Sequence, residues 1–207
     1  MTVYRVPVFF EYRTLMGNHN NGAAPDSIRQ FDEAFAMCRD IYVSKLQDYG
    51  ASWRVMRPMS LTDQLFIKAK RIRTLETKGG AMVDEGIMPE FVAIVNYGIM
   101  AMIQMQLGPA LKADITPERA TELYDSHVAD TRKLLTAKNH DYDEAWRDMR
   151  VCSFTDIILT KLQRIKEIEA NGGQTIVSEG IESNYQDIVN YAVFAIIKLT
   201  ESPSALC

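Results

Sequence analysis

The chain contains two copies of one segment, and this duplication constrains its fold more than any other feature. Residues 45–80 align without a gap on residues 138–173, with 16 of the 36 positions identical. After one extra residue in the second copy, residues 85–103 align on residues 179–197, with 9 of 19 identical. In a duplication that serves packing alone, polar surface positions diverge first. Polar residues kept in both copies therefore indicate a buried polar network or a ligand site.

The residues kept in both copies include charged, amide and aromatic side chains. In the first copy they are Lys45, Asp48, Tyr49, Trp53, Arg54, Thr62, Asp63, Lys68, Arg71, Glu76, Glu85, Asn96 and Tyr97, and in the second copy they are Lys138, Asp141, Tyr142, Trp146, Arg147, Thr155, Asp156, Lys161, Arg164, Glu169, Glu179, Asn190 and Tyr191.

The composition is that of an ordinary globular protein, with 47% apolar and 24% charged residues. The net charge is −4 and no run of lysine and arginine occurs, so duplex nucleic acid is not expected as a partner. The three cysteines have no CxxC spacing, which predicts reduced thiols rather than a disulfide framework or a zinc site.

The sequence predicts no membrane association. The apolar run at residues 6–10 is too short for the core of a signal peptide. The longest apolar tract, residues 94–107, is interrupted by amide side chains and falls short of a membrane span. We therefore expect a cytoplasmic protein.

The hydrophobic spacing predicts an all-α fold. Apolar residues recur at three- and four-residue intervals, and strand-like alternation is confined to the N-terminal arm. We expect six principal helices in two pseudo-symmetric three-helix halves, packed as one helical bundle. The expected divisions are 1–25, an arm that is poorly ordered or a short extended segment; 26–110, the first half; 111–201, the second half; and 202–207, a tail. The expected helices are at about 26–46, 60–78, 86–107, 117–138, 154–170 and 180–200.

The second helix of each half carries cations next to its apolar stripe. Lys68 falls within the stripe and Arg71 at its edge, and Lys161 and Arg164 repeat this arrangement. A lysine in such a position must extend its ammonium group to water or find an anionic partner. One interpretation is an ion pair that fixes helix packing, with Glu76 or Glu85 as the partner in the first half. The other is an anion site, because Lys and Arg one turn apart can share a phosphate.

Carboxylates lie on one face of the third helix in the second half. Glu179, Asp187 and Asn190 share a narrow arc there, and carboxylates two turns apart suit a magnesium ion that also contacts phosphate. In the first half Ala93 replaces the inner carboxylate, so the halves differ and one working site assembled from both is expected. The alternative for these carboxylates is a solvated helix face.

Two tryptophans lie in the loops that follow the first helix of each half. Trp53 precedes Arg54, and Trp146 precedes Arg147. A loop tryptophan can stack on a nucleobase, but it can equally pack over the helices. The sequence leaves both interpretations open.

These motifs resemble a family of phages and bacteria, the nucleotide modification associated domain of type one. Its pattern is a K-x-x-D-Y-G-x-x-W loop, a helix with K-x-x-R and a helix with E-x7-D-x-x-N-Y. The chain has a glycine in the first loop but Asp143 in the second, and it has Asp187 in the second half but Ala93 in the first. The resemblance implies a role in nucleotide metabolism. A more distant similarity to MazG-like all-α nucleoside triphosphate pyrophosphatases implies magnesium-dependent hydrolysis.

We therefore expect a protein that binds a nucleotide phosphate, with magnesium, between its halves, and that acts as a pyrophosphohydrolase if it is catalytic. The alternative is a non-catalytic helical module whose repeated polar residues form a structural network. A monomer or a homodimer fits either interpretation. The expected catalytic residues are Asp48 and Asp141, the expected metal ligands are Glu85, Glu179 and Asp187, and the expected substrate contacts are Lys45, Trp53, Arg54, Lys68, Arg71, Asn96, Lys138, Trp146, Arg147, Lys161, Arg164 and Asn190.

Overall fold

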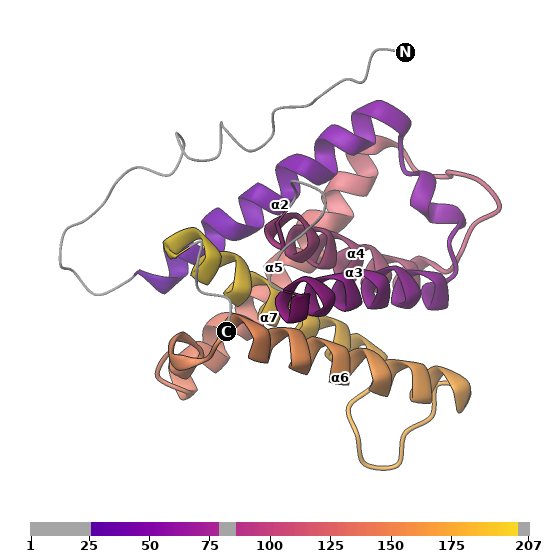
Figure 1. The fold of residues 1–207 in the computed structure, drawn as a ribbon. Coiled ribbons are helices and arrows are strands. Elements are labelled where there is room, and N and C mark those ends of the chain that lie inside the picture. The colour runs from indigo at the N-terminus through magenta and orange to yellow at the C-terminus, as the bar shows by residue number, and fades with distance from the viewer. Residues whose placement is uncertain (1–25, 79–85, 203–207) are drawn as a thin grey trace.

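The structure, a computed structural model, describes residues 26–78 and 86–202 (Figure 1). These residues form six α-helices, two short 3-10 helices and no strand, which confirms the prediction of an all-α bundle of six principal helices. The arm at 1–25, Glu85 and residues 203–207 lie outside the described part of the chain. The elements are α2 (Ser27–Tyr49), η1 (Ser52–Val55), α3 (Pro58–Lys78), α4 (Met88–Leu107), α5 (Pro117–Asp141), η2 (Ala145–Asp148), α6 (Val151–Ala170) and α7 (Ile181–Glu201).

Local signals in the sequence account for several helix ends. The Asp26 side chain caps α2 by accepting from the backbone N–H of Arg29, and Thr116 caps α5 in the same way, directly before a proline at the first helical position. The α2 helix ends at Gly50 and α4 ends at Gly108, whose φ angles are +63° and +73°. A left-handed backbone of this kind is accessible to glycine at little cost.

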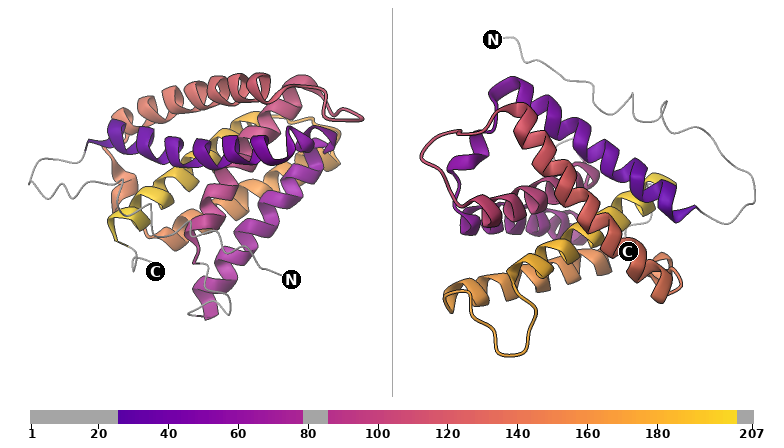
Figure 2. Two further views of the ribbon diagram at one scale, coloured as in Figure 1. Left: turned by 90° about the horizontal axis from the view of Figure 1, so that it is seen from above. Right: turned by 180° about the vertical axis from the view of Figure 1, so that it is seen from behind.

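The apolar helices α4 and α7 pack against each other in the centre of the bundle, with the other four helices around them (Figures 1 and 2). By length and composition α4 could cross a membrane, but 72% of its most apolar window is buried inside the fold. Its apolar surface is therefore covered by neighbouring helices of the same chain.

The α2 and α5 helices, which correspond in the two halves, run antiparallel (Figures 1 and 2). Matching ion pairs join them. Arg39 of α2 binds Asp125 of α5 at 2.6 Å, and Arg132 of α5 binds Asp32 of α2 at 2.8 Å. The two arginines are separated by the same number of residues as residues 45 and 138, and so are the two aspartates. The duplication therefore extends into α2 and α5.

Helices α3 and α6 repeat this reciprocity with two kinds of contact. The hydroxyl of Thr62 donates to Glu169 at 2.7 Å, and that of Thr155 donates to Glu76 at 2.7 Å. Each half thus supplies one threonine and one glutamate to the contact. Matching ion pairs flank these bonds, joining Lys166 to Asp63 at 2.6 Å and Arg73 to Asp156 at 3.2 Å.

Helices α4 and α7 are in close contact at a glycine. A Cβ atom on Gly98 would lie 2.6 Å from Cγ2 of Val189, so a side chain there would force its neighbour to move. Ala192 occupies the position in α7 that corresponds to Gly98, so this contact is not fully symmetric.

Reciprocal contacts of this kind characterise an isologous interface, in which residue i meets j and j meets i across a two-fold axis. The two halves are therefore packed pseudo-symmetrically as one bundle. Several polar residues kept in both copies, namely Thr62, Asp63, Glu76 and their counterparts, serve this interface.

The cysteines differ in state. Cys38 is a free thiol buried within the bundle, and burial raises its pKa above the usual value. Cys152 is disulfide-bonded, so the prediction of reduced thiols is wrong for this residue.

Candidate functional site

The kept arginine of the first loop is a structural anchor. Arg54 of η1 is only 2% exposed. Its guanidinium donates to Asp114 and to the carbonyl of Gly108, each at 2.8 Å, and to Gln104 of α4. A side chain enclosed in this way holds the loop against α4 and the connection to α5, and it is not accessible to a substrate.

The kept arginine of the second loop has a similar role with different partners. Arg147 of η2 binds Glu144, donates to Ser27 and Gln30 of α2 at 2.6 Å, and stacks over the ring of Trp146. Burial would raise the pKa of Glu144, but its hydrogen bonds from Arg147, Ser27 and Asn139 outweigh burial and lower it. The first half thus helps to hold the loop of the second.

A second set of hydrogen bonds, which the sequence did not indicate, holds the η1 and η2 loops in place. Gln104 of α4 donates to the carbonyls of Arg54 and Met56. At the corresponding position of α7, Lys198 donates to the carbonyls of Arg147 and Met149. Gln104 and Lys198 bind corresponding carbonyls although they are different residue types. A search for residues that are identical in the two copies therefore could not find this contact.

Both tryptophans pack inside the bundle. Trp53 and Trp146 are buried. The Trp146 ring stacks on Phe194 with centroids 4.5 Å apart, and its N–H donates to Asn139 at 2.8 Å. Neither ring is presented to solvent, so the structure favours packing over base stacking for both.

The cations of the first half meet a carboxylate that the sequence analysis did not select. Glu90, in the first turn of α4, is buried and binds both Lys68 and Arg71 of α3, with Lys68 at 3.2 Å. Two cations therefore share one carboxylate, and all three residues belong to the first half.

The second half contains a corresponding cluster. Asp187 of α7 accepts from Lys138 of α5 at 2.6 Å through one oxygen and from Lys161 of α6 at 2.5 Å through the other. The Lys161 and Asp187 side chains are largely buried, whereas the Lys138 side chain is 45% exposed. Again two cations share one carboxylate, so these three side chains together carry a surplus of one positive charge.

The pKa values in this cluster follow from its geometry. Burial would raise the pKa of Asp187, but the hydrogen bonds and charges of the two lysines outweigh it and lower the pKa below its usual value. Burial would likewise lower the pKa of Lys138, yet the bond to Asp187 and the charge of nearby Glu179 raise it. Asp187 and Lys138 are therefore both charged at neutral pH.

The two clusters differ by one helical turn in the position of the carboxylate. Glu90 of α4 corresponds to Asn184 of α7, and Ala93 of α4 corresponds to Asp187. The second cation differs as well, because Arg164, the counterpart of Arg71, is exposed. Each cluster is built within one half, and neither draws a residue from the other half.

The kept asparagines also differ. Asn96 donates to the carbonyl of Cys38 at 3.0 Å and accepts from the hydroxyl of Tyr124 at 2.7 Å. Asn190 is 4% exposed, and within the described residues neither atom of its amide has a partner. Phe31 replaces the tyrosine at the corresponding place, so Asn190 lacks the donor that Asn96 has.

The remaining predicted site residues lie at the surface. Lys45, Asp48, Asp141 and Glu179 are exposed. Both oxygens of Asp187 already accept from lysines, and no group of three His, Cys, Asp or Glu residues in the described part of the chain is arranged to hold a metal. These residues therefore do not fit the predicted magnesium ion, and Glu85 lies outside the described chain.

Comparison with protein families gives two matches in the chain. The model described as nucleotide modification associated domain 1 matches residues 45–105 and again residues 138–199, together more than half of the chain. The chain belongs to this family. No curated protein and no solved structure matches it. Each charged cluster lies within one nucleotide modification associated domain.

Each copy of the domain also presents a tyrosine that sequence analysis did not place in the site. Tyr142 caps the C-terminal end of α5, one turn beyond Lys138, and is 70% exposed, and its counterpart Tyr49 is 57% exposed. Tyr142 lies close enough to Tyr191 for its charge to raise the pKa of that residue, after the larger effects of burial and of Asp187. In the sequence, the available signal was that this tyrosine is kept in both copies.

The backbone after this tyrosine is strained only in the second copy. Asp143 and Glu144 have φ angles of +47° and +57° and are the only non-glycine residues with positive φ in the described chain, whereas the first copy has Gly50 at the corresponding bend. Such conformations are unfavourable and concentrate at functional sites. The partners of Glu144 hold this loop in place.

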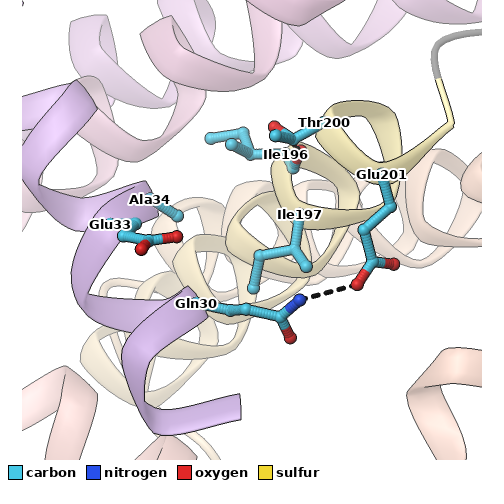
Figure 3. Close-up of a pocket in the computed structure, with 7 residues that line it drawn as sticks. All are labelled: Gln30, Glu33, Ala34, Ile196, Ile197, Thr200 and Glu201. Carbon is cyan, nitrogen blue, oxygen red and sulfur yellow. Dashed lines mark hydrogen bonds between the residues drawn. The ribbon is translucent and has the colours of Figure 1, made fainter. Parts of the chain in front are cut away.

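A cavity of about 40 Å³ lies elsewhere, between α2 and α7 (Figure 3). It is lined by Gln30, Glu33 and Glu201 among others, and Gln30 donates to Glu201 at 2.6 Å. Its two carboxylates make it unsuitable for a phosphate.

Proposed function

We propose that the protein binds the phosphate group of a nucleotide at the Lys138–Lys161–Asp187 cluster of the second domain copy. The observation that carries this proposal is that two ammonium groups share one carboxylate, so the cluster has a surplus positive charge, and one of the two is half-exposed. Charge-assisted hydrogen bonds from lysine to phosphate are strong. The family description supports a nucleotide as the source of that phosphate.

Three features favour the second copy over the first. Its cluster includes Lys138, whose counterpart Lys45 in the first copy is exposed. Its loop contains the strained residues Asp143 and Glu144. The buried amide of Asn190, one turn from Asp187, has no partner within the described residues, and buried polar groups without a partner call for an explanation such as a water or a ligand.

In this proposal Asp187 positions the two lysines and does not bind the ligand. A carboxylate would repel a phosphate, but its bonds to both ammonium groups hold them in place before the ligand arrives. The incoming phosphate then contacts the outward-facing N–H groups of Lys138, each ammonium having three donors.

Titration calorimetry with inorganic phosphate and with deoxynucleoside monophosphates tests this proposal. Lys161→Met and Lys138→Met should each weaken binding at least tenfold, because Lys138→Met removes a charge-assisted contact of about 1.5–3 kcal/mol and Lys161→Met removes the surplus positive charge of the cluster. Lys45→Met is the matched control, since it removes the corresponding lysine of the other copy and should leave binding unchanged. Equal affinities for Lys138→Met and Lys45→Met would reject the site.

Asp187→Asn separates anion binding from metal binding. If the cluster binds phosphate, removing the carboxylate raises its surplus charge from one to two, and phosphate should bind several-fold more tightly to the folded variant. If Asp187 is a magnesium ligand, the same change should abolish magnesium-dependent nucleotide binding. Calorimetry with and without magnesium distinguishes these outcomes.

The catalytic form of the proposal is a cytoplasmic magnesium-dependent pyrophosphohydrolase. Since the described residues do not gather ligands for magnesium, we derive no metal-dependent step. The test is an assay for pyrophosphate release from deoxynucleoside triphosphates in the presence of magnesium. Activity that is lost in Asp141→Asn but kept in Asp48→Asn would support the catalytic form of the proposal.

The second candidate is a non-catalytic helical module, and the reciprocal contacts between the halves favour it. They give Thr62, Asp63, Glu76 and their counterparts a structural role that requires no ligand. If no nucleotide or phosphate raises the melting temperature, this candidate replaces the first.

A further inference from the structure

We infer that the ligand of the second domain copy is a nucleoside monophosphate whose base stacks on Tyr142. This inference rests on the proposed function, because it takes the Lys138–Lys161–Asp187 cluster as the phosphate site. It adds a contact between Tyr142 and the base, and it limits the ligand to one phosphate group.

The first argument is the exposure of Tyr142. Most aromatic residues of this chain that are kept in both copies have a packing role, and both tryptophans are buried. Tyr142 instead is 70% exposed at the end of α5. An aromatic face that is left in water beside a cationic cluster is suited to stacking on a base, and such stacking tolerates any base because every base has a π-face.

The second argument is the spacing of the two contacts. Tyr142 follows Lys138 by four residues, and its backbone N–H closes the last turn on the carbonyl of Lys138 at 3.0 Å. Residues four apart lie on the same side of a helix, about 6 Å apart along its axis, and the charges of Lys138 and Tyr142 both act on Tyr191. This separation suits a phosphate and a base that are joined by one sugar.

The third argument is that the loop carrying Tyr142 is held in place. Tyr142 is followed by Asp143 and Glu144 in the left-handed region, and the Glu144 side chain is bound by Ser27, Asn139 and Arg147. A fixed backbone loses little conformational entropy when a ligand binds.

The charges around the cluster limit the number of phosphates. The two lysines exceed Asp187 by one positive charge. Glu179 lies close enough to affect the pKa of Lys138, and the acidic side chains of Asp141 and Asp143 flank Tyr142. A triphosphate would bring further negative charge into these acidic surroundings, so a single phosphate fits best.

Titration calorimetry of the full chain tests this inference, with dAMP, dTMP, their triphosphates and inorganic phosphate as probes and without magnesium. We expect each monophosphate to bind more tightly than its triphosphate and than inorganic phosphate. Tyr142→Ala should weaken monophosphate binding about tenfold and leave inorganic phosphate binding unchanged. Tyr142→Phe should retain the affinity, and Tyr49→Ala, the counterpart in the first copy, should have no effect.

The outcomes separate this inference from the proposed function. If inorganic phosphate binds in a Lys161-dependent way but Tyr142→Ala changes nothing, the base contact is wrong and the phosphate site stands. If a triphosphate binds more tightly than its monophosphate, the limit to one phosphate is wrong. If neither phosphate nor nucleotide binds, both proposals fail. Circular dichroism of each variant checks that it is folded.

Discussion

The two halves solve the same packing problem with the same residues but build their charged clusters differently. Across the α3–α6 contact, each half provides the same threonine and the same glutamate. In the clusters, by contrast, the carboxylate is Glu90 in one half and Asp187 in the other, displaced by one turn. A substitution on one side of the α3–α6 contact must be matched by a substitution on the other side. A site within one half can change without any change in the other half. The proposed phosphate site, which lies within one half, is accordingly a place where the halves differ.

The largest expected effect is the loss of Asp187. Asp187→Ala leaves two ammonium groups without their counter-charge, and breaking a buried pair by removing one partner costs about 3 kcal/mol. Urea denaturation should show this loss in the free energy of unfolding. Lys45→Ala, at an exposed position of the other half, is the control, and a loss below about 1 kcal/mol in Asp187→Ala would mean that the cluster is solvated.

The same variant should change the pH dependence of stability. Because the pKa of Asp187 is lowered in the folded protein, its contribution is present above the unfolded pKa of about 3.9 and is lost as the pH falls through the folded value. The raised pKa of Lys138 gives a contribution that is present below about pH 10.4 and is lost as the pH rises through the folded value. The losses of stability at low pH and at high pH should both be smaller in Asp187→Ala than in the unsubstituted protein.

Gly98→Ala tests the close contact of α4 with α7. In a helix interior this change would normally stabilise by about 1 kcal/mol, but the new Cβ would lie 2.6 Å from Val189, and such overpacking costs about 1–3 kcal/mol. We expect a net loss of up to about 2 kcal/mol, with Val189→Ala less harmful in this background than alone. Gly86→Ala, which has open space around it, should be neutral. A gain in stability for Gly98→Ala would show that the helices separate easily.

Thr62→Val and Thr155→Val should differ although the residues correspond. Each removes the hydroxyl that donates to a glutamate of the other half, at about 1 kcal/mol. Thr62 also bonds to the hydroxyl of buried Tyr185 at 2.7 Å, for which Phe91 is the counterpart. Thr62→Val should therefore cost about 2 kcal/mol. Equal losses in thermal denaturation would contradict the role of Tyr185.

Tyr124→Phe should make Asn96 resemble Asn190. It removes the hydroxyl that donates to Asn96 and should lower the free energy of unfolding by about 1 kcal/mol. The reverse change, Phe31→Tyr, offers a donor to the second half and should be neutral or stabilising. A marked loss in Phe31→Tyr would show that the space beside Phe31 is too small for a hydroxyl.

The smallest effect is expected for the ion pairs between α2 and α5. Arg39→Ala and Arg132→Ala each remove an exposed pair, so each should cost less than about 1 kcal/mol. The two losses should agree within a few tenths of a kcal/mol, because the pairs are reciprocal. Both should shrink in high salt, since exposed charges are screened. A large difference between them would break the pseudo-symmetry at this contact.

The sequence predicted part of the site and missed the rest for identifiable reasons. Lys161 and Asp187 were assigned from their positions on helix faces, and the structure joins them. Lys138 was assigned as a kept lysine, but its bond to Asp187 depends on how α5 crosses α7. Glu90 was missed because it is not kept in both copies, and the buried positions of Trp53 and Trp146 depend on helices that are distant in sequence.

The sequence by itself determined that the chain is all-helical, that it is duplicated and where its helices lie, because helix periodicity, caps and repeats are local properties of the chain. Only the tertiary structure decided which kept polar residues join the halves and which remain available to a ligand. Thr62 meets a glutamate that lies 107 residues further along the chain. The partner of a polar side chain is set by the packing of whole helices, and helical spacing fixes only the face on which that side chain lies.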